Sequence, residues 1–428
     1  MTDVTRRALV GGTAAGLAGL VGQAQAAEPA VAPSAQQPPA LFGATKGDQV
    51  SLPPLHNDTE VQGPPPEGQP PARRLGVAVV GLGHLSLEQI IPGFAQSKNV
   101  RLAALVSGER DKARAIAAQH GVDERNLYDY AGFDALKDNP DVDIVYIVLP
   151  NSMHAEFTVR AAQAGKHVLC EKPMATSVAD AQRMVDACRQ ADRRLMIAYR
   201  LQYNPVHRQL IAMTRSREFG PVRAIQATNG QNDAANGQWR QIRALAGGGS
   251  LPDVGLYCLS AFRYLTGEEP VEVTGQITQP KDDPRFREIE DICAFTLRFP
   301  SGILATGLSN YSAHESRALR IMAADAWYGA DPAFGYDNLM LQVGRKQGRS
   351  NVVEQRRYAS HNQFATEMDA FAEAIRAGRE PHTPGEEGLA DMRLIEAIYQ
   401  AAAGGSVVRL PRVDGLDTTR GPVPAQEG

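Results

Sequence analysis

Three ionisable side chains in two short stretches have the types and spacing needed to oxidise an alcohol. Lys172 stands between Glu171 and Pro173, directly after an apolar run. Asp253 and Tyr257 follow three consecutive glycines and are four residues apart, so on a helix they would share one face. An alcohol carbon releases a hydride easily only as its hydroxyl proton departs. A nearby ammonium group and a phenolate base would therefore both favour the reaction.

Each of these residues also has a purely structural interpretation. Tyr257 could be a half-buried packing residue, and Asp253 could cap a helix that follows the glycines. Glu171 could either hold a cofactor ribose or orient Lys172. Taken singly, each structural interpretation is the simpler one. The chemical hypothesis therefore depends on the elements that would position these side chains.

A glycine turn earlier in the chain indicates what would accept the hydride. An apolar run, Val77–Val80, leads into Gly81 and Gly83, and a segment compatible with a helix follows at residues 85–94. In a dinucleotide site the first glycine permits a tight turn and the second lets the backbone approach a pyrophosphate, which the helix N-terminus then binds. Ser86 takes the third glycine place, so a purely structural turn is the alternative.

The residues after the second apolar run, Val100–Val106, favour NADP over NAD. NAD-binding folds usually carry an acidic residue there, which accepts a hydrogen bond from the ribose 2′-hydroxyl. This chain has Ser107 and Gly108 in that place, with Arg110 and Lys112 close behind. A hydroxyl and cations suit a 2′-phosphate, which a carboxylate would repel. The alternative is that both cations are solvated residues at the start of a helix.

The chain is expected to be an α/β protein with two domains. Between residues 75 and 196, apolar runs alternate with helical segments, which predicts a Rossmann-type doubly wound parallel sheet. From 197 to 428, alternating apolar residues predict an α+β domain with a large open, mostly antiparallel sheet. The expected strands are 75–80, 100–106, 142–149, 167–170, 293–299, 303–308, 318–322 and 339–343, and the expected helices are 110–120, 154–164, the segment capped by Ser177, 364–375 and 389–398.

The first 26 residues have the order of a secretory signal peptide. Arg6 and Arg7 precede a weakly apolar segment rich in glycine and alanine, and Ala24-Gln25-Ala26 is similar to a cleavage site. Adjacent arginines in this position are typical of the twin-arginine export route, so a periplasmic location is expected. A tail without signal function is the alternative.

Residues 27–74 are predicted to be a proline-rich arm. Eleven of the chain's 28 prolines lie between Pro29 and Pro71, which favours an extended polyproline conformation. The composition suits either a flexible linker or an arm that lies along another subunit.

Composition argues against several classes of function. The net charge of −4 comes from interspersed basic and acidic residues, and aromatic residues make up 6%, so no nucleic-acid partner is expected. The apolar segment near the N-terminus is too short and too glycine-rich to span a membrane, so no membrane contact beyond export is expected. The four cysteines lack a metal-binding spacing. We expect buried small hydrophobic residues and no metal site, with one disulfide conceivable in an oxidising compartment.

Taken together, three motifs resemble the Gfo/Idh/MocA oxidoreductase family over about residues 75–403. They are the turn at Gly81 and Gly83, the Glu171-Lys172-Pro173 stretch, and the segment from Gly247 through Asp253 to Tyr257. Most of the family has His at the place of Tyr257, and Tyr there is typical of the glucose–fructose oxidoreductase branch.

The resemblance implies a periplasmic enzyme with tightly bound NADP that works by a ping-pong mechanism. An aldose such as glucose would be oxidised to its lactone, and fructose or another aldose would then be reduced to a polyol in the same site. Tyr257 would be the acid and base, Lys172 would assist it, and Asp253 would position the sugar. The resemblance also implies a homo-oligomer, a dimer or tetramer, in which the N-terminal arm covers the cofactor across a subunit contact.

The motifs and the resemblance together predict two groups of binding residues. A sugar dehydrogenase with dissociable NADP, an NAD-dependent glycoside hydrolase and a sugar-binding relative without turnover are the alternative functions, and domain packing is the alternative for Trp239. The expected cofactor contacts are Gly81, Gly83, Ser86, Ser107, Gly108, Lys112, Pro150, Asn151, His154, Glu171, Lys172 and Arg200, and the expected sugar contacts are Tyr203, Trp239, Arg240, Asp253 and Tyr257.

Overall fold

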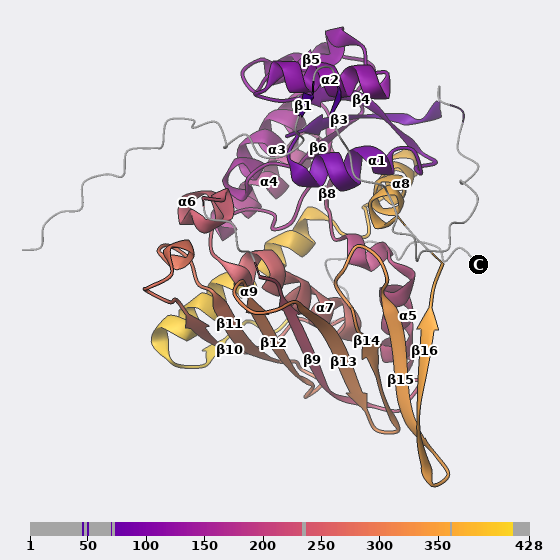
Figure 1. Ribbon diagram of the computed structural model, residues 1–428, viewed down its shortest axis with the longest axis vertical. Coiled ribbons are helices and arrows are strands. Elements are labelled where there is room, and N and C mark those ends of the chain that lie inside the picture. Colours follow the sequence, from indigo (N-terminus) through magenta and orange to yellow (C-terminus); the bar gives the residue numbers. More distant parts are fainter. Residues whose placement is uncertain are drawn as a thin grey trace, which may run out of the picture. The chain divides into compact units, whose positions relative to one another are not determined.

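The computed structural model describes residues 45–46, 49–50, 70, 73–232, 237–359 and 362–413 (Figure 1). The predicted signal peptide, residues 1–26, lies outside the described residues, as does most of the predicted arm, 27–74. Within the arm, β1 (Thr45–Lys46) pairs antiparallel with β2 (Gln49–Val50). None of the described helices has the length and hydropathy needed to cross a membrane.

The first domain is built on a parallel sheet of six strands in the order β5-β4-β3-β6-β7-β8. Three strands have the predicted bounds, and β6 is shorter than the predicted strand 142–149 although Val142 and Leu149 remain buried beside it. The prediction of a doubly wound parallel sheet is therefore confirmed. The strands are β3 (Leu75–Val80), β4 (Val100–Val106), β5 (Leu127–Tyr128), β6 (Ile144–Ile147), β7 (His167–Cys170) and β8 (Leu195–Ile197).

Both faces of this sheet are covered by helices, as alternate strand residues require. One face packs against α3 (His154–Gln163) and α4 (Val178–Gln190), and Ser177 caps α4 by accepting a hydrogen bond from the Asp180 N–H. The other face packs against the helical turns at 86–93, α2 (Arg110–His120) and α8 (Gln363–Arg376). Because α8 follows the strands of the second domain in sequence, the first domain depends on residues far beyond its own sequence.

The second domain is a nine-stranded sheet in the order β16-β15-β14-β13-β9-β12-β11-β10-β17. All neighbours pair antiparallel except β9 and β12, so the predicted open, mostly antiparallel sheet is confirmed. The strands are β9 (Val222–Gly230), β10 (Glu272–Thr278), β11 (Ile292–Arg298), β12 (Leu304–Asn310), β13 (Ser316–Ala323), β14 (Ala326–Ala330), β15 (Met340–Gln347), β16 (Ser350–Arg357) and β17 (Val408–Arg409).

One face of the large sheet packs on α5 (Pro205–Ser216), α7 (Leu256–Thr266) and α9 (Gly385–Gly404) (Figure 1). Burial alternates along β11 as the one-sided pattern predicts, with Cys293 and Phe295 inside and Ala294 outside. All four cysteines are buried and none forms a disulfide, which confirms that they act as small core residues.

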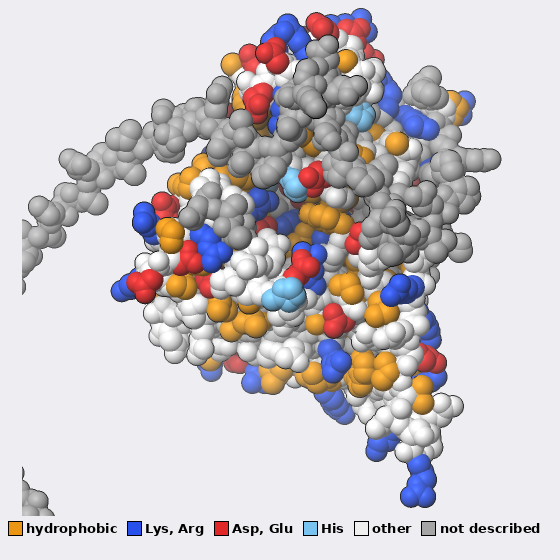
Figure 2. Space-filling model, viewed as in Figure 1, with side chains coloured by type: hydrophobic (Ala, Val, Ile, Leu, Met, Phe, Trp, Pro, Cys, Tyr) orange, Lys and Arg blue, Asp and Glu red, His pale blue; other side chains and the backbone are white. Residues whose placement is uncertain are grey.

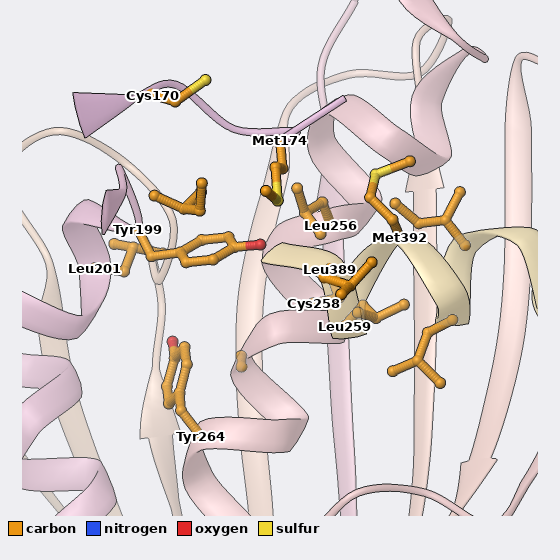
Figure 3. Close-up of a cluster of buried hydrophobic side chains, with 14 of the residues drawn as sticks. Cys170, Met174, Tyr199, Leu201, Leu256, Cys258, Leu259, Tyr264, Leu389 and Met392 are labelled. Atoms are coloured by element: carbon orange, nitrogen blue, oxygen red, sulfur yellow. The ribbon is translucent and has the colours of Figure 1, made fainter. Parts of the chain in front are cut away.

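The cores of the two domains meet beneath the end of β7. Figure 3 shows Met174 of the first domain beside Leu256 of α7, and Cys170 and Met392 of α9 belong to the same core cluster. On the surface, the face in Figure 2 carries basic and acidic side chains interspersed rather than in one stripe. The continuous apolar core fixes the loop after β7 against the segment that begins α7, and these are the two places where the candidate residues lie.

Candidate active site

The glycine turn after β3 fits a bound dinucleotide. Gly81 has φ +95°, and a Cβ there would lie 2.3 Å from the Val148 carbonyl oxygen, so only glycine fits this position. A Cβ at Gly83 would meet no atom within 4 Å, which leaves open space above the turn. The buried Ser86 hydroxyl donates to the Gly81 carbonyl at 2.6 Å. Ser86, at the third position of the glycine motif, therefore stabilises the turn by a hydrogen bond within it.

A hydroxyl and a cation lie at the end of β4, as predicted for NADP. The Ser107 hydroxyl accepts from the Glu109 N–H at 3.0 Å, and the Lys112 side chain is only 6% exposed. Burial lowers the pKa of Lys112, while Glu109, 3.9 Å from its Nζ, acts in the opposite direction. Gly108 is exposed beside them. These residues fit a 2′-phosphate, although the half-exposed Glu109 is an acidic neighbour that the sequence analysis did not weigh.

Lys172 at the end of β7 is held by the second domain. Its Nζ donates to Asp253 Oδ1 at 2.9 Å and to the Asp253 carbonyl oxygen at 3.0 Å. Burial alone would lower the pKa of Lys172, but the charge of Asp253 outweighs burial and raises it above its usual value. Lys172 therefore stays an ammonium ion with a fixed direction.

Asp253 has both carboxylate oxygens engaged. Its second oxygen, Oδ2, accepts from the Tyr311 hydroxyl at 2.6 Å and pairs with Arg240 Nε at 3.2 Å. Burial acts to raise the pKa of Asp253, but Lys172 and Arg240 lower it far below its usual value. Asp253 is therefore a permanent anion that orients Lys172. Tyr311 was not identified from the sequence, because it lies 58 residues beyond Asp253 and carries no motif.

Tyr257 lies on the first turn of α7, directly beside Lys172. The Lys172 Nζ is 4.6 Å from the centroid of its ring, and the Arg200 guanidinium carbon is 5.0 Å from the same centroid. The ring is partly buried. The fold therefore brings Lys172, Asp253 and Tyr257 together as predicted. A phenol flanked by two cations at the carboxyl edge of a dinucleotide-binding sheet can exchange protons with a bound alcohol.

Comparison with known proteins agrees with this geometry. A family model described as an oxidoreductase family with an NAD-binding Rossmann fold matches residues 75–199, and a GFO/IDH/MocA C-terminal domain model matches 207–328. A D-xylose 1-dehydrogenase [NADP(+)] from Haloarcula marismortui is 30% identical over 344 residues, which are 78% of this chain and 92% of that protein. The chain belongs to the Gfo/Idh/MocA oxidoreductase family.

Two further relatives of this chain are named for sugar substrates. The solved structure of an aldose–aldose oxidoreductase from Caulobacter crescentus, complexed with glycerol, is 45% identical with a TM-score of 0.76, over 79% of this chain and 100% of that one. A D-xylose 1-dehydrogenase (NADP(+)) from Haloferax volcanii is 29% identical over 78% of this chain and 98% of its own length. The predicted family is confirmed, and it is one of sugar oxidoreductases with NADP-dependent members.

The glycine stretch of this Gfo/Idh/MocA protein is shaped by Glu290. A Cβ at Gly249 would lie 2.0 Å from the Glu290 carbonyl oxygen, and a Cβ at Gly248 would lie 2.0 Å from the Tyr399 hydroxyl. The buried Glu290 carboxylate accepts from the N–H groups of Gly249 and Leu251, each at 2.9 Å, and from the Tyr399 hydroxyl. The three glycines therefore allow Glu290 to approach the loop that carries Asp253.

Arg200 is fixed by the loop between β14 and β15. It donates to the carbonyls of Phe334 at 2.8 Å and Gly335 at 2.9 Å and to Gln363 Oε1 at 2.6 Å. Its guanidinium carbon lies 4.5 Å from the ring centroid of Tyr336, which is 46% exposed. Tyr336 also interacts electrostatically with Tyr257 and Lys172, so it faces the same centre. The sequence analysis missed Tyr336, because nothing in its sequence context predicts that this loop reaches Arg200.

Three residues predicted to contact cofactor or sugar, Asn151, His154 and Tyr203, instead form hydrogen bonds within the protein. Tyr203 is fully buried, and its hydroxyl pairs with Thr383 Oγ1 at 3.1 Å, so this geometry does not support the predicted sugar contact. Both ring nitrogens of the buried His154 are 2.9 Å from backbone carbonyl oxygens, and Asn151 donates to the Ala246 carbonyl at 2.8 Å. Apolar neighbours on β8 and α8 draw Tyr203 into the core.

The remaining predicted residues lie around the centre. Arg240 contacts Asp253 and stacks on Trp239, with its guanidinium carbon 4.5 Å from the ring centroid. Both side chains are partly exposed. Pro150 precedes the short helical turn that begins with Asn151. Contacts of Trp239, Arg240 and Pro150 with ligands remain predictions.

Proposed function

We propose that this protein is an exported sugar oxidoreductase with a retained NADP. It oxidises an aldose such as glucose to the lactone and then reduces a second sugar, fructose or another aldose, to a polyol. The observation that carries this proposal is the Lys172–Asp253–Tyr257 centre at the edge of the dinucleotide-binding sheet. The bound NADP supplies the two-electron acceptor and donor at that edge, and the turn at Gly81 with Ser107 and Lys112 holds it.

The proposed proton path uses one side chain in both directions. In the oxidative half, the Tyr257 phenolate takes the proton of the sugar hydroxyl while the carbon loses its hydride. In the reductive half, the Tyr257 hydroxyl returns a proton to the oxygen of the second sugar. Lys172 stabilises negative charge on either oxygen, and Asp253 keeps its ammonium group aimed at the centre. Because the two halves release and consume one proton each, no net proton is exchanged over a full cycle.

Retention of the cofactor follows from the proposed location. The twin-arginine signal would deliver a folded protein to the periplasm, where no pool of NADP exists to reload it. The 45% identical aldose–aldose oxidoreductase supports transfer between two sugars. By the family resemblance, the protein would be a dimer or tetramer in which residues 27–74 help to cover the cofactor.

A sugar dehydrogenase with dissociable NADP is the second candidate. Two curated relatives at 30% and 29% identity are NADP-dependent xylose dehydrogenases, and this observation favours exchange of the cofactor in each turnover. The two candidates share the same centre and differ in what restores the oxidised cofactor.

The deciding experiment begins with purification in the absence of added nucleotide. Denaturation of the product should release close to one equivalent of NADP per chain. The native protein should then show a rise in nicotinamide absorbance with glucose or xylose and a fall when a second sugar is added. A protein that emerges empty but turns over with added NADP would identify the dehydrogenase. A loaded protein that responds to no sugar would refute both candidates.

A further inference from the structure

Two buried carboxyl groups share one tyrosine hydroxyl next to the candidate active site. The Tyr146 hydroxyl on β6 lies 2.9 Å from Glu171 Oε1 and 3.1 Å from Glu367 Oε1 on α8. Tyr146 and Glu367 are fully buried, and Glu171 is 6% exposed. Neither Tyr146 nor Glu367 has a role in the proposed proton path.

The number of hydrogens in this cluster decides whether both carboxyl groups can be ionised. A phenol carries one hydrogen and can donate to only one of the two carboxyl groups. If both carboxyls were ionised, the second would face a lone pair of the tyrosine oxygen with no proton between them, in a buried site. One carboxyl must therefore supply a hydrogen itself, so that Tyr146 accepts from that carboxyl and donates to the other.

The surroundings of the two carboxyls decide which one holds the proton. Burial raises the pKa of Glu171 too, but the charges of Lys172 and Arg200 act against this rise, and Glu171 Oε2 accepts from the Lys172 N–H at 3.2 Å. Glu367 Oε2 is buried without any hydrogen-bond partner. An unpaired oxygen costs much less free energy on a neutral acid than on an anion. Burial and the charge of Glu171 raise the pKa of Glu367 well above its usual value.

We propose that Glu367 is a protonated positioning residue whose hydrogen bond through Tyr146 keeps Glu171 ionised and fixed beside Lys172. The bonds then run in one direction, from the Glu367 acid to the Tyr146 oxygen and from the Tyr146 hydroxyl to the Glu171 carboxylate. Glu171 thereby remains an acceptor, which is the form that can bind ribose hydroxyl groups. This consequence for the cofactor rests on the proposed function, whereas the position of the proton does not.

The charges around the cluster favour this state throughout the neutral range. Lys172 follows β7, and Arg200 follows β8; both are cations near Glu171. Glu367 interacts with Glu171 and with Arg200, and Tyr203 packs nearby as a neutral phenol. A second negative charge on Glu367 would face Glu171 across a single hydroxyl. The proton on Glu367 should therefore persist at pH 8.

Infrared spectroscopy tests the proton directly, without sugar or turnover. The full chain, with its glutamate carboxyl carbons labelled with carbon-13, should show a protonated-carboxyl band at pH 8 that is shifted from the unlabelled position. The label excludes aspartate, and the pKa of the buried Asp391, raised to about 6 by burial, leaves that group ionised at this pH. The band should disappear in Glu367→Gln and persist in Glu171→Gln. A wild-type protein without the band, or a band lost only in Glu171→Gln, would overturn the proposal.

Nucleotide affinity provides the second measurement. In protein stripped of nucleotide, Glu367→Gln should keep the dissociation constant for NADP within about threefold, because a neutral amide can also donate to Tyr146. Glu367→Leu and Tyr146→Phe should each weaken binding about tenfold, because a hydrogen bond that orients a charged acceptor is lost. Equal losses of NADP affinity in Glu367→Gln and Glu367→Leu would contradict a neutral hydrogen-bond donor at position 367. Failure of sugar turnover in the wild type would leave both tests unaffected.

Discussion

At the level of single residues, Asp253 and Tyr257 have different tasks although they share one helical segment. Both carboxylate oxygens of Asp253 are engaged by Lys172, Tyr311 and Arg240. Neither oxygen is therefore available to accept a proton from a substrate. Tyr257 instead presents an aromatic ring to two cations. The pair therefore divides into an anion that orients Lys172 and a phenol that we propose as the acid and base.

The first prediction concerns this phenol. Tyr257→Phe keeps the ring against Lys172 but removes the exchangeable proton, so kcat should fall by at least about 100-fold. Single-turnover absorbance after addition of glucose measures the effect. The amount of bound NADP should be unchanged, since the ring is retained. A variant with more than half of the wild-type rate would rule out Tyr257 as the acid and base.

The second prediction concerns cofactor choice. Ser107→Asp places a carboxylate where a 2′-phosphate is expected, and the repulsion should shift the ratio of NAD to NADP affinity by about tenfold toward NAD. Titration of nucleotide-stripped protein with both cofactors measures the ratio. Ser107→Asn, which adds similar bulk without charge, is the matched control. An unaltered ratio in Ser107→Asp would place the 2′-phosphate elsewhere.

At the level of elements, the buried Glu290 controls how the glycine stretch reaches the active site. Its carboxylate accepts from the N–H groups of Gly249 and Leu251, so a residue just before β11 fixes the conformation of the loop. Sequence reasoning located this stretch from its glycines and from Asp253 and Tyr257. It could not identify Glu290, because a glutamate about 40 residues later, next to other acidic residues, carries no local signal of the loop that it binds.

Replacement of one glycine should disturb this loop. A Cβ in Gly249→Ala would lie 2.0 Å from the backbone of Glu290, so the loop must shift. We expect a loss of about 1–3 kcal/mol in the free energy of unfolding together with reduced kcat. Gly404→Ala, whose Cβ would meet only the Ser406 hydroxyl at 3.4 Å, is the control. Denaturant unfolding compares the two, and equal small losses would show that the close approach is not needed.

A buried ion cluster between α7 and α9 predicts a dependence on pH. Arg263 pairs with Glu269, Glu387 and Asp391, and burial raises the pKa of Asp391 to about 6. Because the folded state holds this proton more tightly than the unfolded state, the contribution of Asp391 to stability is full below about pH 4 and is lost as pH rises to about 6. The loss is on the order of 3 kcal/mol.

Comparison of two proteins isolates this effect. The free energy of unfolding of the wild type, minus that of Asp391→Asn, should fall between about pH 4 and pH 6 and stay level above pH 7. Asparagine retains polar contacts with Tyr199 and Arg263 but cannot titrate. A difference that rises with pH would mean that Arg263 keeps Asp391 ionised in the folded state.

At the level of the whole molecule, the sequence predicted the two sheets better than the contacts between them. Strand and helix bounds in the first domain follow from apolar periodicity, which is a local property. Tyr203 was misplaced because its burial depends on Thr383 and α8, which lie far away in sequence. Tyr311 and Tyr336 were missed for the same reason. Motifs mark the residues that carry chemistry, and long-range packing selects the residues that support them.

The arm before the first domain is expected to contribute to retention of the cofactor. Its strand β2 lies against α2, the helix that carries Lys112 beside the predicted 2′-phosphate site. Deletion of residues 27–69 should lower the NADP content after purification by at least about tenfold, which corresponds to the loss of one or two good contacts. Light scattering on both proteins would report whether the oligomer depends on the arm. An unchanged NADP content would leave the arm without a role in retention.

The position of α8 has a consequence for biosynthesis. The face of the nucleotide-binding sheet covered by the helical turns at 86–93 and by α2 is completed by Phe364, Met368 and Phe371 of α8. A ribosome must therefore have made the chain through α8, including strands β9 to β16, before this half of the protein can close, although its own strands are translated first. Maturation of the coenzyme site is in this way tied to the synthesis of α8. A polypeptide cut short before α8 should therefore leave the coenzyme site unfinished.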